Sequence, residues 1–186
     1  MDAPDFWLMP HEIVLRDKRT VILRPEEDKD LEPTWEMMST LSRESLQYLP
    51  IPFTRERVEG WFKKIDYNVA LPILGIVKET NKERIIASAT LAFSNRDYDK
   101  HKASFGISVH DDYQNAGLGS YLTGYMIRIG RAKGLKKIVL EVVSHNERAI
   151  KVYEKNGFRI EGKLVNDHWN YILNKYSDIL VMGIQL

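Results

Sequence analysis

Apolar residues along the chain follow two periodicities, one typical of strands and one typical of helices. Strand-like stretches, alternating or continuously apolar, occur at residues 14–24 (around a turn), 69–79, 84–93, 103–109, 138–143, 158–165 and 176–185. Apolar residues recur at helical spacing at residues 26–45, 54–65, 118–134 and 146–156. The order of these elements predicts an α/β (α+β) fold with helices beside a mixed, partly antiparallel sheet.

Three segments carry more detailed predictions. Residues 26–45 read as one helix that Asp28 or Asp30 can cap. Residues 48–53 contain two prolines and are expected to form an extended loop. The run 138–143 is almost continuously apolar, which predicts a strand covered on both faces.

The composition narrows the classes of function. A chain of 186 residues is long enough for a single domain, 1–186, with residues 1–11 as an N-terminal extension. Cysteine is absent, which excludes disulfides, thiolate zinc sites and a cysteine nucleophile. A formal net charge of +1 without long single-sign blocks argues against nucleic-acid binding. No apolar run is long enough to cross a membrane, and the first ten residues do not resemble a secretion signal, so we expect a cytoplasmic protein.

A segment between the strand 103–109 and the helix 118–134 predicts an anion site. Gly117 and Gly119 let main-chain N–H groups approach an anion without a Cβ clash. The start of the helix offers unpaired N–H groups and a partial positive charge, which suit a pyrophosphate. The Walker sequence is absent, and Leu122 stands where a Rossmann fingerprint needs its third glycine. A tight turn without a ligand is the alternative interpretation.

Two spaced motifs give this segment a more specific meaning. The first contains Gln114, Gly117 and Gly119, and the second contains Asn146, Ala149, Tyr153, Gly157 and Phe158. With these motifs the chain resembles the GNAT superfamily of N-acetyltransferases, over about residues 12–186 and most closely over 103–162. Residues 41–45 are similar to the early helix of bacterial and archaeal protein acetyltransferases.

The resemblance implies a GNAT-like fold with a splayed central strand pair, acetyl-CoA as co-substrate, and no metal. The strands 103–109 and 138–143 would diverge around the pantetheine arm, and the segment that Gln114 opens would bind the pyrophosphate through main-chain N–H groups. Tyr153 would lie beside the thioester sulfur. The implied cofactor-binding residues are Ile107, Ser108, Val109, Gln114, Asn115, Ala116, Gly117, Leu118, Gly119, Ser120, Asn146, Ala149 and Tyr153.

Acetyl transfer to an amine defines the chemistry that the site would perform. An amine attacks a thioester only when neutral, so a base must take a proton, and the departing thiolate needs an acid. Tyr153 is the predicted acid, with a core aromatic as the alternative. Glu141, the one charge in the strand 138–143, is the predicted base, as in similar enzymes that acetylate protein N-termini; an ion pair with Lys137 is the alternative. The N–H of Val109 could stabilise the oxyanion.

Histidines and a basic cluster supply further candidates. His110 and His145 could also act as the base, and the alternative for each is an exposed loop histidine. The other three histidines, His11, His101 and His168, have no metal-ligand spacing. A basic cluster could attract the acceptor or the 3′-phosphate of CoA, or simply be a solvated helix end; it consists of Arg128, Arg131, Lys133, Lys136 and Lys137.

By resemblance, the acceptor amine would bind between residues 41–53 and 167–177. Aromatic and acidic side chains available there are Tyr48, Phe53, Trp169, Tyr171, Tyr176, Glu44, Asp167 and Asp178. We expect an amine on a protein or peptide, at an N-terminus or a lysine. The alternatives are a small-molecule amine (polyamine, amino acid or antibiotic) and a non-catalytic acyl-CoA sensor. A homodimer could form through an edge strand at residues 179–182.

Overall fold

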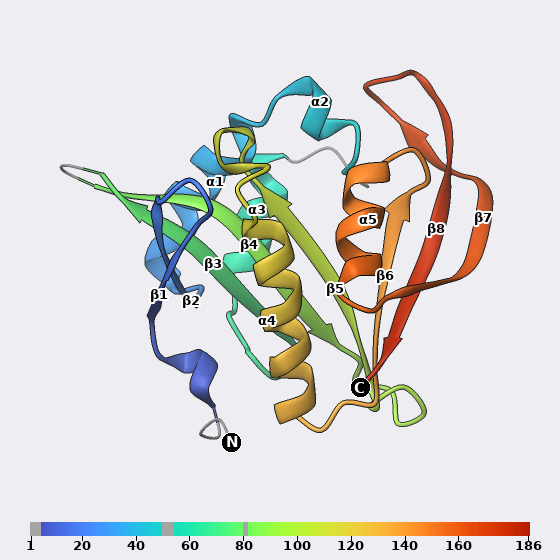
Figure 1. Cartoon of the computed structure of the whole chain (residues 1–186), viewed down its shortest axis with the longest axis horizontal. Coiled ribbons are helices and arrows are strands. Elements are labelled where there is room, and N and C mark those ends of the chain that lie inside the picture. The colour runs from blue at the N-terminus through green and yellow to red at the C-terminus, as the bar shows by residue number, and fades with distance from the viewer. Residues whose placement is uncertain (1–4, 50–53, 80–81) are drawn as a thin grey trace.

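The computed structural model describes residues 5–49, 54–79 and 82–186, and over these residues it forms one sheet of eight strands (Figure 1). In sheet order the strands are β1 (His11–Val14), β2 (Thr20–Pro25), β3 (Ala70–Lys78), β4 (Glu83–Phe93), β5 (Lys102–Val109), β6 (Lys137–Val143), β8 (Lys175–Gln185) and β7 (Arg159–Asn170). The β5–β6 pair is parallel, and the other neighbouring pairs are antiparallel. The predicted α/β class with a mixed, partly antiparallel sheet is confirmed.

Helices cover both faces of this sheet (Figure 1). One face carries α4 (Leu118–Ala132) and α5 (Glu147–Lys155), which also contact each other. The opposite face carries α1 (Leu31–Ser39) and α3 (Arg55–Phe62), and the short α2 (Arg43–Leu46) lies across one end of the sheet. Three 3-10 turns, Phe6–Leu8, Asp28–Asp30 and Asp111–Tyr113, complete the helical elements of the described residues.

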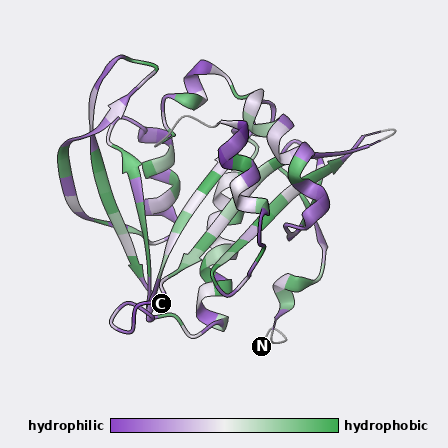
Figure 2. Ribbon diagram, turned by 180° about the vertical axis from the view of Figure 1, so that it is seen from behind, coloured by the Kyte–Doolittle hydropathy of each residue, from purple (hydrophilic) through white to green (hydrophobic). Residues whose placement is uncertain are grey.

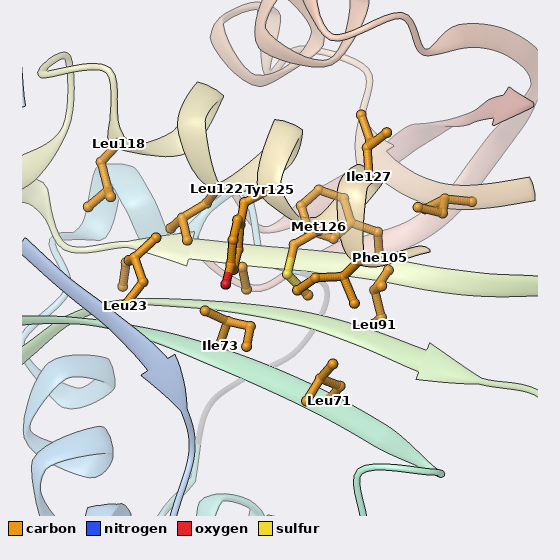
Figure 3. Packing of buried hydrophobic residues seen from close by; sticks show 14 of the residues in the cluster. Leu23, Leu71, Ile73, Leu91, Phe105, Leu118, Leu122, Tyr125, Met126 and Ile127 are labelled. Carbon is orange, nitrogen blue, oxygen red and sulfur yellow. The ribbon is translucent and has the colours of Figure 1, made fainter. Parts of the chain in front are cut away.

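Each face of the sheet has its own hydrophobic core. On the α4 side, Leu122 and Met126 lie over Ile73 of β3 (Figure 3). On the other side, Met37 of α1 packs in a second cluster with Leu74 of β3. Figure 2 shows that the hydrophobic positions concentrate in the strands between these helices. Burying one such side chain stabilises the folded state by about 1.5–3 kcal/mol, so the central strands are held in place and can position a site.

The strands β5 and β6 pair at one end only. Their parallel register joins Lys102–Ser104 to Lys137–Val139, although β5 continues to Val109 and β6 to Val143. Beyond this register the two strands diverge toward the start of α4 (Figure 1). The predicted splayed central pair is therefore confirmed. We call the space between residues 105–109 and 140–143 the wedge.

The prediction of one continuous helix over residues 26–45 is wrong, because residues 40–42 separate α1 from α2. The hydroxyl of Thr40 donates to the carbonyl of Glu36 (2.7 Å), which closes the end of α1. The hydroxyl of Ser42 accepts the N–H three residues on (3.1 Å) and caps α2. Short polar side chains of this kind satisfy main-chain groups that a continuous helix would otherwise use.

The C-terminal hairpin is longer than predicted and places its strands differently. β7 extends to Asn170, through a polar stretch in which the register shifts between Leu164 and His168. β8 lies between β6 and β7, so residues 179–182 are hydrogen-bonded on both sides. The prediction that these residues form a dimer edge is wrong. The sequence pattern located β8 but did not reveal its neighbours.

The N-terminal segment packs into the domain from its first described residues. Trp7 is 4% exposed and belongs to the core under α4, and the ring of Phe6 contacts that of Tyr125 at 5.6 Å. The part of the expected extension after residue 4 is therefore integrated with the fold. Residues 50–53 of the predicted loop lie outside the described residues. Among the described helices, none is long and apolar enough to cross a membrane.

Candidate active site

A cleft of about 850 Å³ occupies the wedge. Its walls come from β5, β6, the first turn of α4, α5, α2 and the β7–β8 hairpin. The predicted residues that line it are Ile107, Ser108, Val109, Gln114, Asn115, Gly117, Gly119, Ser120, Glu141, Asn146, Ala149 and Tyr153. Residues spread over 47 positions of sequence thus meet at one place, because the two strands separate there.

Because of the sheet register, some main-chain N–H and C=O groups of β5 point toward the wedge. The N–H of His110 donates to the carbonyl of Ile86 (2.8 Å), continuing the register that pairs Val109 with Ala87. Bonded positions alternate along an antiparallel pair, so the main-chain groups of Ile107 and Val109 point away from β4. They face the wedge, where β6 does not pair with them. Polar main-chain groups that lack a strand partner can bond an extended ligand, such as a pantetheine arm.

The turn before α4 is shaped to offer N–H groups to an anion. Asn115 has a φ of 61° and Gly117 a φ of 93°, both in the left-handed region, and Gly117 stands at the N-cap position without a capping side chain. The side chains of Ala116 and Leu118 are buried in the core, so these two predicted residues could bind a ligand only through the main chain. Unpaired N–H groups at this helix start suit a phosphate.

Tyr153 of α5 lies at the inner wall of the cleft. It is 8% exposed, and its ring packs against Phe105 at 6.2 Å and Phe158 at 6.0 Å. Burial raises the pKa of Tyr153 to about 12, so its hydroxyl is protonated at neutral pH and can donate a hydrogen bond. Asn146 caps α5, since its Oδ1 accepts the N–H of Ala149 (3.2 Å). That bond leaves the Asn146 amide nitrogen for a ligand.

Glu141 lies on the opposite face of β6 from Tyr153. Its neighbours Leu140 and Val142 are buried in the α4-side core with Tyr153, while Glu141 is exposed and lines the cleft. The prediction that β6 is covered on both faces is therefore wrong. Lys137, the alternative partner of Glu141, instead bonds Glu161 at 2.6 Å. Glu141 is thus available to a ligand that enters from this face.

The two histidines proposed as alternative bases lie in different surroundings. His110 is 5% exposed rather than in an exposed loop; its Nε2 lies 3.2 Å from the Thr40 hydroxyl, and its Nδ1 accepts the N–H of Asp112. It does not line the cleft. His145 is exposed beside the ring of Tyr48 at 5.6 Å, and partial burial and Lys175 lower its pKa.

Cationic residues at the cleft differ from the predicted basic cluster. The cluster lies toward the far end of α4, roughly 20 Å along a helix of 15 residues, where Lys133 lies over the ring of Trp7. The cleft is lined instead by Arg16, which precedes β2, and by Arg148, Lys151 and Lys155 of α5. The spacing of the last three, on one face of a helix that follows the Asn146 motif, was a signal that sequence reasoning missed.

The expected acceptor residues are only partly brought together. Tyr48, Asp167 and His168, together with Leu41, Ser45 and Leu49, line the cleft. Trp169, Tyr171 and Tyr176 are exposed on the β7–β8 hairpin without lining it, and Phe53 lies outside the described residues. Glu44 is exposed away from the cleft, and Asp178 pairs with Lys163 at 2.6 Å. No group of three or more potential metal ligands occurs among the described side chains.

The acetyltransferase (GNAT) family model matches residues 35–158, which are 124 of the 186 residues. The chain therefore belongs to this family of acetyltransferases, as the two motifs indicated. Enzymes of the family use acetyl-CoA as co-substrate.

Individual relatives are similar over part of the chain. L-amino acid N-acetyltransferase AaaT of Escherichia coli (strain K12) is 37% identical over 79 residues, 42% of this chain and 49% of that protein. Spermidine N(1)-acetyltransferase of the same strain is 32% identical over 84 residues, 45% of this chain and 44% of that protein. The chain thus spans about half the length of the curated relatives it matches. The structure of spermidine N-acetyltransferase from Vibrio cholerae, with CoA and spermine, matches with a TM-score of 0.72 at 25% identity, over 89% of this chain and 95% of that one.

Proposed function

We propose that the chain is an acetyl-CoA-dependent N-acetyltransferase that acetylates a primary amine. The observation that carries the proposal is the two-sided wedge. One side has the open start of α4 and the buried Tyr153, and the other has the exposed carboxylate of Glu141, for which no bond to another described residue occurs. A thioester held along β5 between these sides would be open to an amine from the face of Glu141.

The residues of the wedge would divide the chemistry among them. Glu141 would take a proton from the incoming ammonium, directly or through water, and the neutral nitrogen would attack the thioester carbon. The N–H of Val109 would bond the oxyanion. The C–S bond would then break, with Tyr153 donating a hydrogen bond to the departing sulfur. The attacking nitrogen would lose its second proton as the adduct collapses, and the departing sulfur would receive that proton, while the first leaves from Glu141 to water. Because the pKa of Tyr153, about 12, lies above that of a thiol, about 8.5, Tyr153 keeps its own proton throughout.

The acceptor that this geometry supports best is a small-molecule amine rather than the protein or peptide amine expected from the sequence. The acceptor side is enclosed, because Asn170 of β7 donates to the carbonyl of Gln47 (2.8 Å) and Arg43 of α2 donates to the carbonyl of Ile172 (3.4 Å). The relatives named for amino-acid and spermidine acetylation support the same choice.

A peptide amine is the second candidate. Trp169, Tyr171 and Tyr176 are exposed on the hairpin beside the entrance and offer apolar surface to a longer substrate. This observation is weaker than the enclosure, because exposed aromatic residues also occur on hairpins that bind nothing.

The test is release of the free CoA thiol from acetyl-CoA in the presence of separate amine classes. The panel contains L-amino acids, spermidine, peptides with a free α-amine, and blocked peptides with lysine as their one amine. Release with the amino acids or spermidine alone is the expected result. Release with the peptides alone would replace the small-molecule acceptor by the second candidate. Binding of acetyl-CoA without release in any arm would favour a sensor.

A further inference from the structure

The side chain of Gln114 lies between the wedge and α2. Its amide nitrogen is 2.9 Å from the carbonyl oxygen of Val109, at the end of β5, and 2.9 Å from the hydroxyl oxygen of Ser45 in α2. The same residue opens the turn that precedes α4. One side chain thus contacts the last peptide of the splayed strand and the helix that borders the acceptor side of the cleft.

These contacts continue into a chain of hydrogen bonds in which Gln114 donates to both of its neighbours. The hydroxyl of Ser45 donates to the carboxylate of Asp111 (2.7 Å), which also accepts the hydroxyl of Ser42 (2.6 Å) and its main-chain N–H (2.9 Å). A primary amide has two N–H donors, and Gln114 uses one on Val109 and one on Ser45. The reverse orientation of the amide would bring two oxygen atoms together at Val109. The donor and the acceptor of each bond are therefore fixed: Gln114 donates to Val109 and to Ser45, and Ser45 donates to Asp111.

Asp111 is the acceptor at which this series of hydrogen bonds ends. Although burial opposes the effect, hydrogen bonds from Ser42 and Ser45 lower the pKa of Asp111, so it carries its charge at neutral pH. The helix that it holds, α2, has four residues and cannot be stable by itself. The position of α2 therefore depends on the bonds to Asp111 and on its contacts with the hairpin.

The bond from Gln114 changes what Val109 can offer to a ligand. Both main-chain groups of Val109 face the wedge, and a free carbonyl oxygen there would repel an oxyanion on the thioester. With the carbonyl held by Gln114, Val109 presents its N–H as the group available to the ligand, while Ile107 has both groups available. The oxyanion is thereby directed toward the end of β5.

We propose that Gln114 is a positioning residue for acetyl transfer, which holds the carbonyl of Val109 so that this residue offers only its N–H to the ligand, and which couples Val109 through Ser45 and Asp111 to α2. The inference rests on the proposed acetyltransferase function. It gives Gln114 a side-chain role apart from pyrophosphate binding, where the main chain suffices. A displacement of α2 by a bound amine would reach the Val109 carbonyl through this chain.

The first test separates catalysis from cofactor binding in the variant Gln114→Leu, which keeps the side-chain volume and removes both donors. Removal of a direct oxyanion donor costs about 10²–10³ in kcat, and an indirect positioning effect should cost about 10- to 100-fold. The Kd for acetyl-CoA should change less than about twofold, whereas a loss of binding alone would leave kcat intact. The control is Gln185→Leu, an exposed glutamine at the end of β8. The proposal is overturned if Gln114→Leu has the same kcat as the wild type. It is also overturned if the Kd for acetyl-CoA rises by the same factor by which kcat falls.

The second test does not need turnover. In NMR spectra of the wild-type protein, a scalar coupling across the hydrogen bond should join the amide nitrogen of Gln114 to the carbonyl carbon of Val109. Ser45→Ala should shift that carbonyl resonance, although Ser45 does not touch Val109. Absence of the coupling, or an unmoved resonance in Ser45→Ala, overturns the positioning role. If the coupling is present but the wild type acetylates no amine in the panel, the proposed function fails instead.

Discussion

Replacing Glu26 with glutamine should stabilise the protein at high pH and change little at low pH. Glu26 is 5% exposed, and burial, reinforced by Asp30 and opposed by Arg24, raises the pKa of Glu26 from 4.5 to about 7. The folded state therefore binds this proton more tightly than the unfolded state, and stability is lost as the pH rises from about 4.5 through 7. A shift of about 2.5 units corresponds to about 3 kcal/mol in the free energy of unfolding. Glutamine keeps the shape and cannot ionise.

Urea unfolding of the wild type and Glu26→Gln at about pH 5 and about pH 8 measures this difference. The free energy of unfolding of Glu26→Gln, relative to that of the wild type, should be about 2–3 kcal/mol higher at pH 8 than at pH 5. Glu26→Ala should show the same pH-dependent gain together with a constant loss from the cavity that it leaves. A difference between wild type and Glu26→Gln that is equal at both pH values would refute the reasoning.

Three further substitutions test other parts of the structure. Gly117→Ala places a Cβ 3.3 Å from the Arg16 side chain at a left-handed φ. Thermal unfolding should show a loss of about 1–3 kcal/mol in the free energy of unfolding, and titration calorimetry should show weaker acetyl-CoA binding. Unchanged stability and binding would contradict the role of this turn. Asp30→Ala leaves Arg24 buried without its bidentate partner and should cost about 3–5 kcal/mol in urea unfolding. Lys151→Ala should weaken acetyl-CoA binding and reduce its salt dependence, whereas Lys136→Ala, distant from the cleft, should not.

Local sequence signals predicted much of the fold, because each rests on a short stretch of chain. Asn146 caps α5, and Gly157 ends it with a φ of 95°. The apolar pattern located β5 and β6 within one residue at each end, and the family resemblance gave their splay. The motif positions Gln114 and Tyr153 both line the cleft, and the roles that the resemblance implied for them stay predictions.

Predictions failed where the answer depended on contacts between distant elements. His110 follows a strand and precedes polar residues, which suggested exposure, yet Thr40 and Arg84 enclose it. The order of β8 and β7 in the sheet is also a tertiary property, and it removed the expected dimer edge at residues 179–182. The side-chain bonds of Gln114 include one to Ser45, 69 positions away in the sequence. No periodicity in the chain could have indicated them.

The central claim is that Tyr153 assists the departure of the CoA sulfur in the wedge. The most direct test compares wild type and Tyr153→Phe in two measurements, the rate of CoA thiol release with an accepted amine and the Kd for acetyl-CoA. We predict that turnover falls by about 10²–10⁴-fold while the Kd changes less than about twofold, because phenylalanine keeps the ring packing and removes the hydroxyl. Turnover equal to the wild type, or a Kd that weakens in parallel with turnover, would contradict the account.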